Sequence, residues 1–302
     1  MFTWPEATVM RLLAATGIFL VAVVYVRGWR RLPRERLRLR RPQVETASPR
    51  ALWLFMAGLA LLAVALISPL GYLATQYFSA RIVQHMLIVA SIPSLLMLSN
   101  PVVPLAYGLP ASRRDALLAS LRRPADASSG RLRRAAHWAT SPGVTLLTFL
   151  CVCWFWYDPS IHGATLRHGW VHAIELLSLF GVGLLNWWHI TAAWPQTHGT
   201  MHPIVRIVYA FVSIWPVKLV GLVLLFFPDI NYGYPATFQF SGLHINDYNF
   251  GAMIAWIVSG LAYAAAAVAL ARQWLDEEAD KPALPESAWA TDESMNVPGI
   301  KR

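Results

Sequence analysis

The chain has 302 residues, of which 56% are hydrophobic and 14% are charged, and its formal net charge is +9. Soluble domains carry about 25% charged residues, so this composition excludes an ordinary soluble domain. The mean hydropathy of +0.45 points the same way. The basic balance does not indicate nucleic-acid binding, because the Arg residues lie in short segments between long apolar blocks. That is how membrane proteins fix their orientation.

Long apolar blocks predict an all-α, polytopic bundle of seven transmembrane helices, because about 20 residues cross the hydrocarbon at about 1.5 Å each. The expected spans are 7–26, 51–68, 82–98, 144–156, 171–190, 204–227 and 250–271. They make one transmembrane domain, residues 1–274. The fourth span is short, and Pro93 predicts a kink in the third. Residues 275–302 mix acidic residues with prolines, which predicts a disordered cytoplasmic tail.

The orientation follows from the positive charges. Of the Lys and Arg residues between and after the expected spans, twenty lie in alternate segments and two in the others. Positive residues favour the cytoplasmic side, so we expect the N-terminus outside and the C-terminus in the cytoplasm. The long basic segment 107–143 is expected to hold a short amphipathic helix against anionic lipid headgroups.

Ionisable residues inside the spans point to a candidate site, because such residues usually face the bundle interior and often carry a function. His85 lies one turn into the third span, while His172 and Glu175 share one face at the start of the fifth. The expected orientation brings all three toward the outer face. Imidazole and carboxylate suit Cu(II) or Zn, and thioether suits Cu(I). We therefore predict a metal site of His85, His172, Glu175 and Met86.

Simpler interpretations remain open at this stage. Lys218, in the sixth span, could pair with Glu175 and compete with a metal cation. His162, His168 and His244 are expected to be ordinary anchors at the membrane interface. Arg81 falls in the outer segment before the third span.

Several of these residues also form part of a longer pattern. It runs along the chain as Gln84, His85, Met86, Leu87, Pro93, Leu95–Leu98, Pro101, Trp156, Pro159, Val171–Ala173, Glu175, Trp187, Trp188, Asp247, Gly251, Met253 and Trp256. In order and spacing it resembles the CtaG family, the seven-helix assembly factors of caa-type cytochrome c oxidase. The resemblance covers roughly residues 50–272.

The chain departs from the family pattern at four positions. Three family histidines are replaced, by Arg81, Tyr157 and Leu176, and a glutamine is replaced by Tyr248. His85 and His172 are the surviving pair. The family is thought to help supply copper to the oxidase, so the lost ligands bear directly on that role.

The resemblance implies a non-enzymatic assembly factor in the bacterial plasma membrane, with oxidase subunits and membrane lipid as partners. We expect it to assist copper insertion from the outer face. A metal-free accessory or structural subunit of a respiratory complex is the first alternative. A haem b or quinone redox protein, with His85 and His172 as paired haem ligands, is the second. A transporter is favoured less, because the sequence reveals neither paired broken helices nor repeat halves.

Overall fold

The computed structural model describes residues 4–32, 47–122, 130–199, 201–227, 230–235, 237–240 and 243–280. These residues are nearly all helical, as the sequence predicts, with one small exception. Thr237–Phe240 (β1) and Leu243–Asn246 (β2) form an antiparallel pair in which Thr237 faces Asn246. This hairpin lies in a segment that was expected to be an outer loop.

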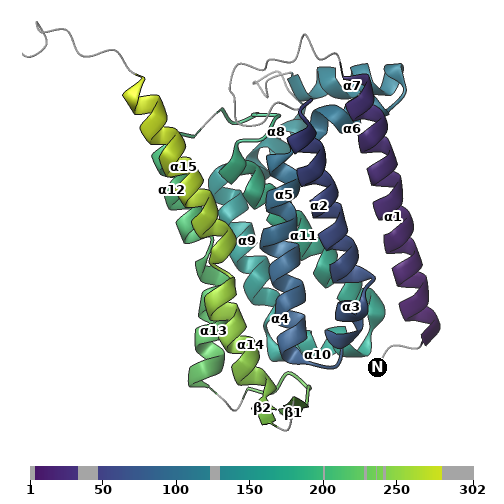
Figure 1. Cartoon of the computed structure of the whole chain (residues 1–302), viewed down its shortest axis with the longest axis vertical. Coiled ribbons are helices and arrows are strands. Elements are labelled where there is room, and N and C mark those ends of the chain that lie inside the picture. Colours follow the sequence, from purple (N-terminus) through teal and green to yellow (C-terminus); the bar gives the residue numbers. More distant parts are fainter. Residues whose placement is uncertain are drawn as a thin grey trace, which may run out of the picture.

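The helices form an elongated bundle (Figure 1). In chain order they are α1 (Trp4–Arg31), α2 (Pro49–Leu66), α3 (Pro69–Leu73), α4 (Phe78–Met86), the π-helical turn η1 (Leu87–Ser91), α5 (Ile92–Leu98), α6 (Val102–Gly108), α7 (Ala111–Arg122), α8 (Arg131–Ala139), α9 (Pro142–Trp156), α10 (Pro159–Arg167), α11 (Gly169–Thr191), α12 (Pro203–Val212), α13 (Trp215–Phe226), α14 (Asp247–Val258) and α15 (Leu261–Ala279).

Six stretches of the described chain are long and apolar enough to cross a membrane. The count reaches seven if α8 and α9, which meet at a 66° bend, are taken as one span. The weak member is the predicted fourth span, because α9 alone has 15 residues. The last span is longer than expected: α15 runs to Ala279, so the predicted tail begins as helix, and residues 281–302 lie outside the described part.

Several helices begin with the same local signal. Ser48, Ser68 and Asp158 each precede a proline, and each side chain accepts hydrogen bonds from backbone N–H groups in the first helical turn. Proline suits the first helical position, since its missing N–H would have no partner there, and Ser or Asp oxygens satisfy the neighbouring donors. These short motifs make the helix starts readable from the sequence.

Three spans are interrupted within the bundle. The third passes through η1 directly before Pro93, which fits the predicted kink, because proline cannot donate the helical hydrogen bond. The sixth breaks between α12 and α13, just before Pro216, and the seventh breaks at Ser259 and Gly260. The sequence interpretation missed the interruptions in the last two spans, which neighbour each other through α13·α14 and α12·α15 packing.

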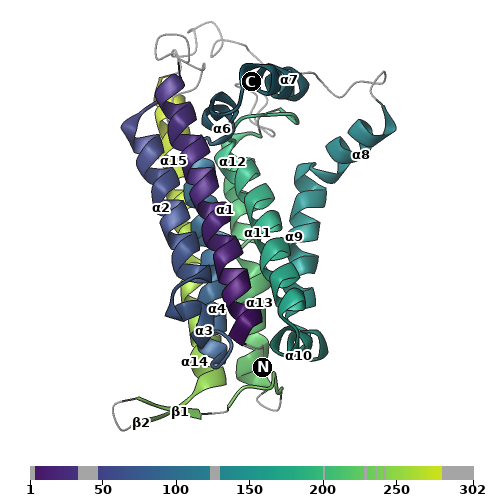
Figure 2. The same ribbon diagram turned by 90° about the vertical axis from the view of Figure 1, so that its right-hand side faces the viewer.

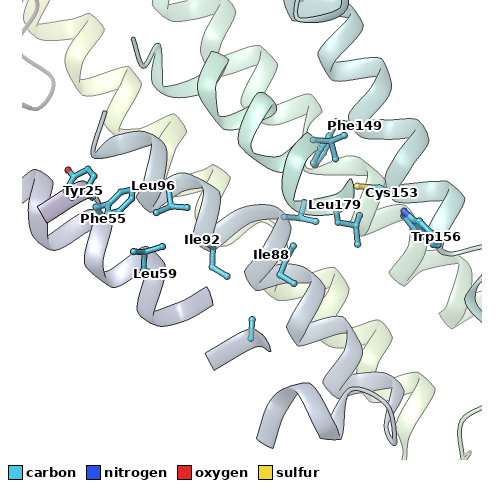
Figure 3. Packing of buried hydrophobic residues seen from close by; sticks show 13 residues of the cluster. Tyr25, Phe55, Leu59, Ile88, Ile92, Leu96, Phe149, Cys153, Trp156 and Leu179 are labelled. Carbon is cyan, nitrogen blue, oxygen red and sulfur yellow. The ribbon is translucent and has the colours of Figure 1, made fainter. Parts of the chain in front are cut away.

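The largest apolar core joins the N-terminal helices to the middle of the bundle (Figure 3). Tyr25 of α1 stacks on Phe55 of α2, with ring centroids 3.6 Å apart. The helix α1 also meets α6 so closely that a Cβ at Gly28 would lie 1.7 Å from the carbonyl oxygen of Pro104. Only glycine allows this approach, which fixes α1 against the bundle.

The two ends of the bundle differ in character (Figures 1 and 2). One end carries α3, α10, the β1–β2 hairpin and the start of α1, and we name it the hairpin end. The other carries α6, α7, α8 and the end of α15, and we name it the basic end after the Arg residues of α7 and α8. The predicted short helix in segment 107–143 is thus two helices. Which end faces the cytoplasm stays a prediction.

Candidate functional site: a buried Arg–His–Glu cluster

Glu175 of α11 is the centre of a polar cluster near the hairpin end, and its side chain is fully buried. Its Oε2 lies 3.2 Å from Nη1 of Arg81 and 2.9 Å from Nδ1 of His172. Its Oε1 lies 3.3 Å from Nε2 of His85 and 3.9 Å from Nδ1 of His162. One carboxylate therefore gathers side chains from α4, α10 and α11.

Arg81 supplies the permanent positive charge of the cluster. It is fully buried, and it donates from Nε to the Tyr234 hydroxyl at 3.1 Å and from Nη2 to Oγ1 of Thr165 at 3.2 Å. Its Nη1, besides bonding Glu175, lies 2.6 Å from Nδ1 of His172. The guanidinium is thus surrounded by acceptors. A guanidinium stays charged in proteins, so Arg81 and Glu175 form a lasting buried ion pair.

The predicted place of Arg81 was wrong, because the third span starts earlier than the apolar block. Residues 78–81 belong to α4, and Asp247 explains why. Its carboxylate accepts hydrogen bonds from the backbone N–H groups of Phe78 and Ser79 and from the Ser79 hydroxyl. An anion at a helix N-terminus satisfies free donors and complements the helix dipole. Asp247 therefore holds the first turn of α4, and with it Arg81, inside the bundle.

The predicted alternative of a Glu175–Lys218 pair was also wrong. The ion pairs of Glu175 run to Arg81 and to histidines. The ammonium of Lys218 instead donates to the carbonyl oxygen of Trp256. Spacing along the chain favoured the wrong cation, because it put Lys218 inside a span and Arg81 in the segment before one.

His162 belongs to the cluster and was missed as an ordinary interface residue. It lies on α10, is fully buried, and its ring nitrogens contact the Trp156 carbonyl oxygen at 3.2 Å and the Tyr234 hydroxyl at 3.3 Å. Burial, helped by the nearby charge of Arg81, lowers the pKa of His162 to about 3. The imidazole is therefore neutral at physiological pH. Its place after the Asp158–Pro159 helix start was the signal that could have found it.

Two buried atoms in the cluster have no hydrogen-bond partner in the described structure. They are Nε2 of His85 and Oε1 of Glu175, which face each other at 3.3 Å. The other ring nitrogen of His85 contacts the Tyr157 hydroxyl at 3.2 Å. Buried polar atoms are nearly always paired, so this side of the carboxylate is the one place where the cluster has spare capacity for a ligand.

The four predicted metal ligands do not converge as a set. His85, His172 and Glu175 meet, whereas Met86 lies in an apolar cluster with residues such as Phe78 and Ile82. Among the described residues, no group of three or more His, Cys, Asp or Glu side chains is arranged to hold a metal ion. Arg81 gives the physical reason, because its guanidinium occupies the Oε2 side of Glu175. As arranged here, the residues do not fit a resident metal.

The comparison with protein families decides what this bundle is. The family model described as the cytochrome c oxidase caa3 assembly factor, Caa3_CtaG, matches residues 23–277. The chain belongs to this family. No curated protein and no solved structure gives a match.

Membership in the caa3 assembly factor family confirms the resemblance seen in the sequence, and the structure shows what several of those residues do. Gln84 donates to the carbonyl oxygen of Ala65 at 2.8 Å, and Trp156 donates to the Ser178 hydroxyl at 2.8 Å. Asp247 holds α4. In this member of the family, these three positions of the pattern therefore build the frame around Glu175.

Proposed function

We propose that this member of the assembly factor family is a non-enzymatic accessory protein of cytochrome c oxidase, in the bacterial plasma membrane, whose cluster is held metal-free by Arg81. The observation that carries the proposal is the contact of Arg81 Nη1 with both Glu175 and His172. A fixed guanidinium neutralises the carboxylate and repels a second cation at the same oxygen. The cluster then acts as a rigid polar core that shapes the hairpin end for a partner.

Copper insertion from the outer face is the second candidate, and one observation favours it. Nε2 of His85 and Oε1 of Glu175 make no well-directed hydrogen bond, although they lie 3.3 Å apart, on the side of the carboxylate away from Arg81. Imidazole is a good copper ligand. Copper would here be a cargo, held briefly by His85 and Glu175, with His162 near enough to join them after a small movement.

The geometry of the cluster does not favour haem binding. Paired haem ligands must leave room for a macrocycle between their nitrogens. Here His85 and His172 both reach the single carboxylate of Glu175, at 3.3 and 2.9 Å, so the space between them is filled by that side chain.

Copper titration of the purified full-length chain separates the first two candidates. We expect the wild type to bind no more copper than the His85→Ala variant, with His168→Ala as the matched control, since His168 is exposed at the start of α11. One tightly bound copper per chain, lost in His85→Ala and kept in His168→Ala, would overturn the metal-free proposal and establish the cargo role.

The assembly role itself is tested in cells. Deleting the chain should lower the amount of assembled oxidase, and the wild-type chain should restore it. Normal oxidase content in the deletion strain, under conditions where the oxidase is needed, would contradict both candidates.

A further inference from the structure

Lys218 is an ionisable residue of the sixth span that takes no part in the Glu175 cluster. It lies in α13, eight residues before Phe226, and its side chain is partly exposed. Its ammonium donates to the carbonyl oxygen of Trp256 and lies 4.8 Å from the centroid of the Trp256 ring. The side chain is therefore held at the seam between α13 and α14.

The break in the last span creates this resting place. α14 ends at Val258 and α15 begins at Leu261, and the last carbonyl groups of a helix lack helical N–H partners. Trp256 offers one of these carbonyls. A Cβ at Gly260 would lie 3.3 Å from Cε of Lys218, so the glycine makes room for the lysine stem. Lys218 is thus directed at a fixed point of the surface.

The charge of Lys218 is left without a counter-charge inside the described chain. The ion pairs there join Arg81 or histidines to Glu175 and Arg114 to Asp115. An ammonium has three donors, while a single hydrogen bond and one ring contact engage it here. Charged side chains within the hydrocarbon are costly and are normally paired, so a carboxylate from outside the chain would complete the arrangement.

The four helices α12 to α15 expose large apolar side chains. They include Phe211, Trp215, Trp256, Ile257 and Leu261. These helices lie on the side of the bundle opposite to α1 (Figures 1 and 2). Eight helical residues place Lys218 about 12 Å from the end of α13, which favours a partner within the membrane over lipid headgroups. The chemistry fits a helix that lies in the same membrane.

We propose that Lys218 is a docking point for a transmembrane helix of the oxidase that carries a carboxylate at the depth of Lys218. The inference rests on the proposed function for its partner, and on the unpaired ammonium for its position. The exposed apolar side chains of α12 to α15 provide the packing surface, and the ion pair sets the depth and rotation of the incoming helix.

Site-specific photo-crosslinking in cells that make the oxidase tests the proposal. A photoreactive amino acid replaces Ile257, which is 59% exposed and follows Trp256 in α14, and in a matched control it replaces Phe19 of α1, which is 66% exposed. We expect a crosslink to one oxidase subunit from position 257 and not from position 19. The crosslinked segment should contain an Asp or Glu within its span.

Three variants then separate charge from local structure. Lys218→Arg keeps the charge, Lys218→Gln keeps a donor for the Trp256 carbonyl without the charge, and Lys218→Met keeps neither. We expect Lys218→Arg to give the same yield of crosslinked product as wild type. In Lys218→Gln and Lys218→Met the yield should fall about tenfold, as it would if the ion pair contributes a factor of about ten to the affinity. Equal crosslinking in wild type and Lys218→Gln would overturn the proposal. Lys218 would then only stabilise the end of α14 through the Trp256 carbonyl.

Failure of this inference differs from failure of the proposed function. If deleting the chain lowers oxidase content but position 257 crosslinks no oxidase subunit, the docking point is wrong and the assembly role stands. If deletion leaves oxidase content unchanged, the assembly role is wrong. The charges can also be exchanged: Lys218→Glu is made in this chain, and the crosslinked acidic residue of the oxidase is replaced by Lys. Either single change should abolish the crosslink, and the two together should restore it.

Discussion

The Arg–carboxylate pairs at the two ends of the bundle differ in burial. At the hairpin end, Arg81 and Glu175 are fully buried and bonded to side chains from several helices. At the basic end, Arg114 and Asp115 form an ion pair whose side chains are 31% and 66% exposed. Both are Arg–carboxylate contacts at short distance, so burial and partners are what differ.

The difference in burial decides whether a charged side chain needs fixed partners. A buried charge must keep its partners, since removing one leaves the other uncompensated in a medium of low dielectric constant. An exposed charge is screened by water and salt, and its geometry matters little. The hairpin end therefore fixes a constellation of side chains, whereas the basic end presents exposed positive charge.

The largest expected effect is that of Arg81→Met. It removes the guanidinium and leaves Glu175 buried without its permanent counter-charge, so we expect a loss of about 3–5 kcal/mol in the free energy of unfolding. Thermal unfolding of the purified chain in detergent measures it.

The double variant Arg81→Met, Glu175→Leu is the control for this prediction. Replacing a whole buried pair by apolar side chains is often neutral, so most of the stability should return. If the double variant is as unstable as the single one, the pair is not the unit that matters at the hairpin end.

Asp247→Asn sharpens the comparison at a second buried carboxylate. The amide offers one acceptor in place of two and directs donors toward the N–H groups of Phe78 and Ser79. We expect a loss of about 2–3 kcal/mol, with the start of α4 more open to hydrogen exchange. Normal protection of residues 78–82 would show that Asp247 does not hold this turn.

The pH dependence of the free energy of unfolding tests the burial of neutral His162. Its folded pKa of about 3 lies below the value near 6.5 expected in the unfolded chain, so the unfolded state binds the proton first. Stability from this residue is complete above about pH 6.5 and falls as the pH drops toward 3. Between pH 7 and 5 the loss is about 2 kcal/mol. His162→Gln should lower this slope, and an unchanged slope would contradict the assignment.

The sequence predicted the parts of the molecule that depend on local pattern. Apolar blocks located the spans, and helical spacing put His172 and Glu175 on one face toward His85. The family pattern led to the right family. Each of these signals is carried by residues close together in the chain or in a fixed order along it.

The rest depended on contacts between distant segments. Asp247 lies 169 residues from Phe78, and the start of α4 cannot be placed without it. Arg81 therefore looked like a loop residue. Its partners Thr165 and Tyr234 lie outside the spans, where apolar periodicity gives no information. The choice between Arg81 and Lys218 as the cation for Glu175 was likewise decided by packing.

The smallest expected effect belongs to the basic end. Arg114→Met removes an exposed ion pair with Asp115 and a contact of the guanidinium 5.1 Å from the Tyr107 ring. Exposed pairs of this kind contribute little and are screened by salt, so the unfolding midpoint should match that of wild type at both low and high ionic strength. A loss approaching that of Arg81→Met would break the comparison, because the basic end would then also hold a charge network that folding requires. If the midpoint matches that of wild type, the buried cluster at the hairpin end stabilises the fold and the exposed pair at the basic end does not.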